Sequence, residues 1–107
     1  MKVARTTRWD VAKHGPLSEA NIRLRHQPPE MFRISRYSYD AGSRFSQSTR
    51  AGVCYVLRGE VRFGETKLHA GDEVSFDDCS CEVEVAGEGR VEVVFVWELP
   101  PAPESRV

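Results

Sequence analysis

Turn-forming residues interrupt this chain so often that only short segments remain between them. Examples are Asp40-Ala41-Gly42, Arg58-Gly59-Glu60, Ala70-Gly71-Asp72 and Gly87-Glu88-Gly89. Short apolar or alternating runs between turns are typical of β-strands. A helical hydrophobic period persists for no more than about one turn, except around residues 16–21. The sequence therefore predicts an all-β chain of about eight to ten short strands.

Alternation within the segments places the expected strands. Asn21 to His26 carries Ile22 and Leu24 on one side, with arginines between them, and this pattern predicts a half-buried strand. Further strands are expected at 32–39, 53–57, 61–63, 66–69, 73–76, 79–86 and 91–99, with a polar strand between Gly42 and Gly52. A chain of 107 residues is long enough for one core, so residues 1–99 are expected to form a single domain with an N-terminal arm. Residues 100–107 (PPAPESRV) are expected to form a flexible, proline-rich tail.

Composition excludes several classes of partner. The formal net charge is -1, and no basic stripe with interleaved aromatic residues is present, so nucleic-acid binding is not expected. No apolar run approaches the ~20 residues that a membrane-spanning helix needs. The first residues, MKVARTTRWD, lack the apolar segment of a secretory signal. With three cysteines and no such signal, the chain is expected to be cytoplasmic, with reduced thiols.

Many short strands in one domain must close into a sandwich or barrel, which protects their edges. The segments YVLRGEV (55–61) and LHAGDEVSF (68–76), with the turns around them, resemble the cupin superfamily. The resemblance covers about residues 30 to 98. It implies a cupin-type double-stranded β-helix, or jelly-roll barrel, with a ligand site inside the barrel.

The resemblance also implies where the family's metal ligands would lie. In the family, three histidines and one glutamate hold a metal inside the barrel. Counting back from Gly59, Gly52 occupies the glutamate position, and Ser48 and Ser46 occupy the first two histidine positions. A neutral hydroxyl is a poor ligand for a transition metal, and glycine has no ligating side chain. We therefore expect no metal and no cofactor.

The third histidine position has two readings. A literal count from Gly71 places Glu82 there. Strand alternation sends Cys81, Val83 and Val85 inward instead, and buried unpaired glutamates would be costly, so Cys81 is the preferred residue. An alternative zinc site would combine Cys79 and Cys81 with Cys54 and His69, but a buried cysteine more often packs as a small apolar residue.

Arginines and tyrosines near the serines suggest what the barrel would bind. Arg44 and Arg50 share the strand parity of the two serines, so they could hold an anion, or they could be solvated. Tyr39 and its neighbour Tyr37 could stack on a ligand or pack in the core. His14 and His26 are expected at the surface. The predicted ligand-binding set is Ser46, Ser48, Arg50, Arg44, Cys54, Cys81 and Tyr39.

These residues favour a metal-independent cupin-type protein that binds a small, polar or anionic molecule, as a sensor or accessory protein. One alternative is an enzyme without metal, such as an isomerase, epimerase or dehydratase, which would need a titratable pair inside the barrel. Another is a metal enzyme with displaced ligands. A homodimer is also expected, because the strands at 53–57 and 91–99 are apolar on both faces, and the outer face needs cover from the N-terminal arm or from a partner.

Overall fold

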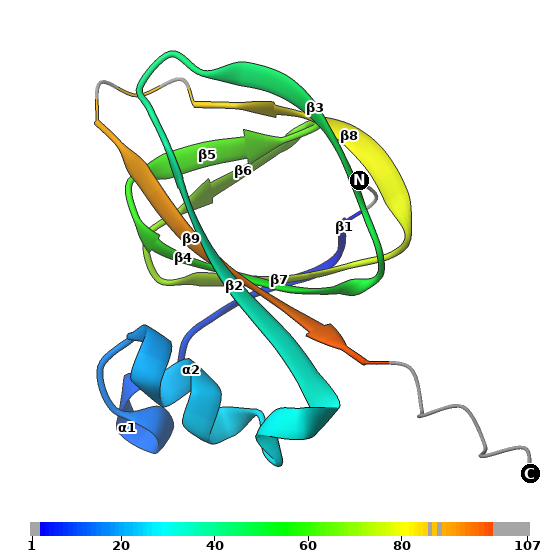
Figure 1. Ribbon diagram of the computed structural model, residues 1–107. Helices are drawn as coiled ribbons and strands as arrows, with labels where there is room; N and C mark the ends of the chain where they lie inside the picture. Colours follow the sequence, from blue (N-terminus) through cyan, green and yellow to red (C-terminus); the bar gives the residue numbers. More distant parts are fainter. Residues whose placement is uncertain (1–2, 86, 88, 100–107) are drawn as a thin grey trace, which may run out of the picture.

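Short strands make up most of the chain, as Figure 1 shows. The computed structural model describes residues 3–85, 87 and 89–99, so the tail predicted at 100–107 lies outside the described residues. The helical elements are α1 (Val11–His14), α2 (Glu19–Arg25) and the 3₁₀ turn η1 (Pro29–Met31). The strands are β1 (Val3–Arg8), β2 (Phe32–Tyr39), β3 (Arg44–Thr49), β4 (Gly52–Arg58), β5 (Glu60–Phe63), β6 (Thr66–His69), β7 (Asp72–Phe76), β8 (Cys79–Glu84) and β9 (Val91–Glu98).

The described strands form two antiparallel sheets that lie face to face (Figure 1). One sheet has the order β1-β7-β4-β9-β2 and the other has the order β3-β8-β5-β6. The protein is therefore mostly β, as the sequence predicted, and the strands expected at 32–39 and 66–69 coincide with β2 and β6. Strands β2 and β3 follow each other in the chain, and each is an edge strand of a different sheet.

Glycine makes the tight connection between β4 and β5. Gly59 has φ of 84°, which side chains other than glycine's rarely adopt. A Cβ at this position would also lie 2.8 Å from the carbonyl oxygen of Arg90. The turn can therefore pass this close to the start of β9 only with glycine at position 59.

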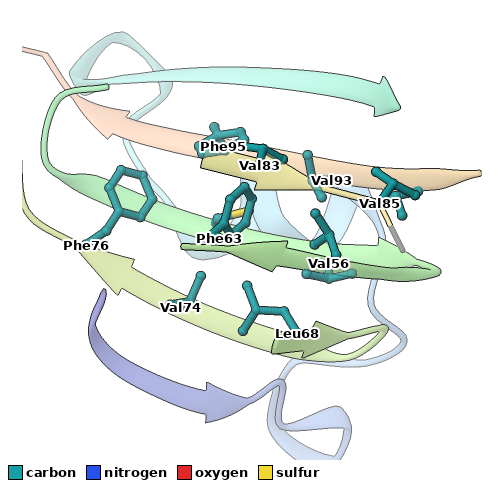
Figure 2. Packing of buried hydrophobic residues seen from close by; sticks show 12 residues of the cluster. Val56, Phe63, Leu68, Val74, Phe76, Val83, Val85, Val93 and Phe95 are labelled. Carbon is teal, nitrogen blue, oxygen red and sulfur yellow. The ribbon is translucent and has the colours of Figure 1, made fainter. Parts of the chain in front are cut away.

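Apolar side chains from both sheets fill the space between them. Figure 2 shows Phe63, Val83 and Phe95 pointing toward one another there. The buried cluster consists of Cys54, Val56, Val61, Phe63, Leu68, Val74, Phe76, Val83, Val85, Val91, Val93 and Phe95. On β8 the predicted alternation is confirmed, because Val83 is buried and Glu82 is exposed. The interior is thus a packed core of the kind expected for a small sandwich.

A second apolar layer lies on the outer face of the five-stranded sheet. Tyr55, Val94 and Val96 point away from the interior and are buried against Trp9 and Ile22. Trp9 and Ile22 belong to the N-terminal arm, which we define as residues 9–31. The arm therefore covers the face on which the sequence-based homodimer prediction rested. The single chain does not test the homodimer itself.

The strand predicted at Asn21 to His26 is wrong, because these residues belong to the helix α2 and its C-cap. Ser18 begins the helix, and its side chain accepts a hydrogen bond from the backbone N–H of Asn21 at 3.1 Å. On a helix Ile22 and Leu24 do not share a face, so Ile22 is buried while Leu24 is 70% exposed. Among the described residues, no helix is long and apolar enough to cross a membrane.

Candidate functional site

A hollow of about 520 Å³ lies where the edge strands β2 and β3 leave the interior open. Its volume falls in the range of ligand pockets, roughly 300–1,000 Å³. Five of the lining residues lie on the strands β2, β3 and β9, and two lie just beyond strand ends. The described lining is Arg33, Tyr37, Gln47, Ser48, Arg50, Trp97 and Leu99.

The register of β2 against β9 explains why Arg33 and Tyr37 face this hollow. Arg33 is opposite Trp97, and Tyr37 is opposite Val93. Residues that are opposite each other in an antiparallel pair share one face of the sheet. Val93 is buried between the sheets, so its side of β2 is the inner side. Arg33 and Tyr37 therefore project toward the second sheet at the end of the apolar core.

Aromatic rings hold the guanidinium of Arg33 on the wall of the hollow. Its Cζ lies 5.8 Å from the centroid of the Trp97 ring. Trp97 in turn stacks on Phe95, with ring centroids 5.4 Å apart and planes 10° apart. A guanidinium in contact with an aromatic face keeps its N–H edges available for hydrogen bonds in its own plane. Arg33 forms no ion pair with any carboxylate of the described residues.

Gly52 allows Trp97 to occupy the back of the hollow. A Cβ at position 52 would lie 2.5 Å from the carbonyl oxygen of Val96 and 2.8 Å from Cδ1 of Trp97. It would also lie 3.4 Å from the ring of Phe76, which packs against Phe95. The position that the family resemblance assigns to a metal-binding glutamate is therefore packed against aromatic rings. Any ligand would lie at the mouth of the interior rather than inside it.

The predicted serines and arginines do not act as one group. Ser48 and Arg50 line the hollow. Ser46 is exposed, and Arg44 forms an ion pair of 3.6 Å with Glu82 on the exposed face of the sheet. Arg44 thus corresponds to the solvated alternative, and Ser46 lies away from the hollow. Phe45, the apolar side chain of β3, takes the inner face and packs against the core. Alternation therefore turns Arg44, Ser46 and Ser48 to the other face. Ser48 borders the hollow from the edge strand of its sheet.

Tyr39 and Cys54, two residues of the predicted ligand-binding set, contribute to packing instead of lining the hollow. The Tyr39 hydroxyl donates a hydrogen bond of 3.4 Å to Oε1 of Gln47, and the Tyr39 ring packs against Phe45. Cys54 is fully buried in the core, and burial raises the pKa of its thiol above the ordinary range. A thiol kept neutral in this way is neither a good nucleophile nor a good zinc ligand. The side chain of Cys81 lies outside the described residues, while its backbone pairs with that of Gln47.

The described side chains do not assemble a metal site. Among them, no group of three or more histidine, cysteine, aspartate or glutamate residues is close enough to share an ion. His69, a member of the alternative zinc set, is exposed and lies 3.3 Å from a carboxylate oxygen of Glu60. It therefore lies on the solvent side of its sheet, whereas Cys54 lies in the core.

A second polar cluster lies beneath the N-terminal arm, and sequence reasoning missed it. Nε2 of His26 is 2.7 Å from the hydroxyl oxygen of Tyr55. Arg25 donates to the same oxygen at 3.5 Å, forms an ion pair with Glu73 and lies over the ring of Trp9. Burial raises the pKa of Tyr55 to about 12 and lowers the pKa of His26. His26 is thus half-buried and bonded to Tyr55, rather than a fully solvated surface histidine.

No protein-family model matches this chain, and no curated protein matches it.

Proposed function

We propose that this protein binds a small anionic molecule, without a metal, in the hollow between β2 and β3. The observation that carries the proposal is that two guanidinium groups, those of Arg33 and Arg50, line the same hollow. The described lining contains no carboxylate, and it adds the neutral donors of Gln47 and Ser48. Arginine is the side chain best suited to bind carboxylates and phosphates, because it presents several N–H donors in one plane.

The proposal includes a fold of the cupin jelly-roll type. Jelly rolls have eight strands in two sheets, connected as two Greek keys. The orders β2-β9-β4-β7 and β3-β8-β5-β6 support this assignment, since each sheet combines strands that are far apart in the chain. Strand β1 adds to the edge of the first sheet beside β7. Under this assignment the hollow lies at the open end of the jelly roll. The protein itself would act as a sensor or accessory protein.

Catalysis without a metal receives less support than binding. A general acid or base works best when its pKa lies near the operating pH. The described lining of the hollow holds two arginines and one tyrosine, with no histidine or carboxylate. The titratable pair formed by His26 and Tyr55 lies on the outer face of the five-stranded sheet, under the arm. An isomerase, epimerase or dehydratase would need such a pair inside the hollow.

Anion binding can be tested by calorimetry with phosphate, acetate, succinate and benzoate, with and without a chelator. We expect at least one of these anions to bind, with the same affinity in EDTA. Arg33→Gln should weaken that binding by about tenfold or more, because it removes a charged hydrogen-bonding partner. The matched control is Arg36→Gln, since Arg36 lies on the opposite face of the same strand and pairs with Glu92.

Three results would contradict the proposal: none of the anions binds, EDTA abolishes binding, or both variants lose affinity equally. Native mass spectrometry of freshly purified protein provides an independent test, because a molecule that co-purifies with the chain should be an acid.

A further inference from the structure

The hollow between β2 and β3 has two kinds of wall. Arg33, Arg50, Gln47 and Ser48 provide hydrogen-bond donors, while Tyr37, Trp97 and Leu99 provide aromatic and aliphatic surface. A small inorganic anion would use only the donors and would leave the apolar surface in contact with water. A ligand that satisfies both walls carries an anionic group at one end and an apolar body at the other.

Arg33 determines the shape of the anionic group. One face of its guanidinium is directed to the Trp97 ring, at 5.8 Å from the centroid. Trp97 is itself fixed by its stacking on Phe95 and by its close approach to Gly52. The contact with Trp97 therefore favours an orientation of this exposed guanidinium in which its edges can donate two parallel hydrogen bonds. A planar carboxylate accepts two such bonds in the plane of the fork.

Tyr37 is the apolar surface best placed to receive a ring. Its side chain is 37% exposed, one of four large hydrophobic side chains of the described residues that remain exposed. Its ring packs edge to face on Phe95, with centroids 5.7 Å apart, so it is supported by the core. A rigid and accessible aromatic ring beside a fixed cation favours a flat, unsaturated ligand.

We propose that the ligand is an aromatic monocarboxylate, with its carboxylate on Arg33 and its ring against Tyr37. This inference rests on the proposed anion-binding function and makes it more specific. The volume of about 520 Å³ is ample for one substituted benzoate, whereas phosphate or acetate would fill only a small part of it. Affinity for the aromatic acid comes from burial of its ring in addition to its charge.

The test compares four probes by calorimetry on the full chain: benzoate, benzamide, acetate and inorganic phosphate. We expect benzoate to bind at least about tenfold more tightly than each of the other three. Arg33→Lys, which keeps the charge but loses the planar fork, should weaken benzoate binding by about tenfold. Arg36→Lys on the opposite face of β2 should leave it unchanged. Tyr37→Ala should reduce benzoate binding toward the acetate level without changing the affinity for acetate.

The possible failures are distinguishable. Phosphate or acetate binding as tightly as benzoate would overturn the aromatic inference and leave the proposed anion-binding function standing. Benzamide binding as tightly as benzoate, or no binding by any probe, would overturn both. Benzoate binding that Arg33→Lys or Tyr37→Ala does not change would overturn the assigned position. Thermal unfolding of each variant, monitored by circular dichroism, verifies that a loss of binding does not reflect a loss of fold.

Discussion

At the residue scale, the imidazole of His26 is a charge-sensitive contact between the arm and the sheet. Burial lowers the pKa of His26 from its ordinary value of 6.5, and the neighbouring Arg25 lowers it further, while Glu73 opposes the shift. Nε2 of His26 faces the hydroxyl of Tyr55 at 2.7 Å, and Arg25 already donates to that oxygen. The neutral imidazole can accept a hydrogen bond from the Tyr55 hydroxyl, whereas the protonated imidazole cannot.

The pH dependence of stability follows from this lowered pKa. In the unfolded chain His26 titrates near 6.5, and in the folded chain it titrates at a lower pH. Between these two values the unfolded chain binds more protons, so the free energy of unfolding falls as pH falls through that window and gains nothing further above it. Urea unfolding of the wild type and of His26→Phe should show that the wild type loses more stability between about pH 7 and pH 5. Parallel losses in the two proteins would contradict this account.

Strand β3 shows at the residue scale what sequence reasoning could not determine. The family spacing drew attention to Ser46 and Ser48, and the arginines were grouped with them by parity. The side chain that decides the orientation of β3 is Phe45, the strand's single large apolar residue. One apolar residue is a weak alternation signal, so the sequence alone did not determine which face of β3 turns toward the core. Along β8 and just beyond it, the buried valines Val83 and Val85 made the signal strong enough to predict correctly.

At the element scale, α2 separates two residues that a strand would treat alike. Ile22 is fully buried against the outer face of the five-stranded sheet, and Leu24 is 70% exposed. Ile22→Ala should therefore destabilise the fold by about 2–5 kcal/mol, through lost burial and the cavity left behind. Leu24→Ala, the matched control, should change stability by no more than about 0.5 kcal/mol. Equal losses in chemical denaturation would mean that residues 21–26 are a strand after all.

The length of α2 and the spacing of its apolar residues explain why the sequence predicted a strand there. Seven residues are too few for a helical period to appear, and two apolar residues two positions apart imitate a strand. The signal that was present is local: Ser18 ahead of Glu19, in the pattern of a helix N-cap with an acidic first turn. Tertiary contact of Ile22 with the sheet then stabilises a helix that would not persist alone.

At the scale of the whole molecule, turns and alternation predicted a mostly β chain, but not the hollow. Arg33 and Trp97 are 64 positions apart in the chain and meet only through the register of β2 against β9. The contribution of Gln47 depends on how the edges of two different sheets approach each other. No short motif encodes such a juxtaposition, so the sequence could identify Ser48 and Arg50 but could not supply their neighbours.

The arrangement of layers also affects the oligomeric state, because the arm covers an apolar face of the five-stranded sheet. The sequence predicted a homodimer because the outer faces of β4 and β9 are apolar, and no observation on the single chain tests that prediction. The arm now provides the cover: Trp9 contacts Tyr55 edge to face at 5.5 Å, and Val94 and Val96 are buried in the same layer. With that face covered, the strongest reason for a partner is removed, because the large hydrophobic side chains left exposed among the described residues lie mostly on the arm itself. We therefore expect light scattering of the full chain at micromolar concentration to give the monomer mass of 12.1 kDa. A stable particle of twice that mass would restore the homodimer and would require an interface other than the covered face.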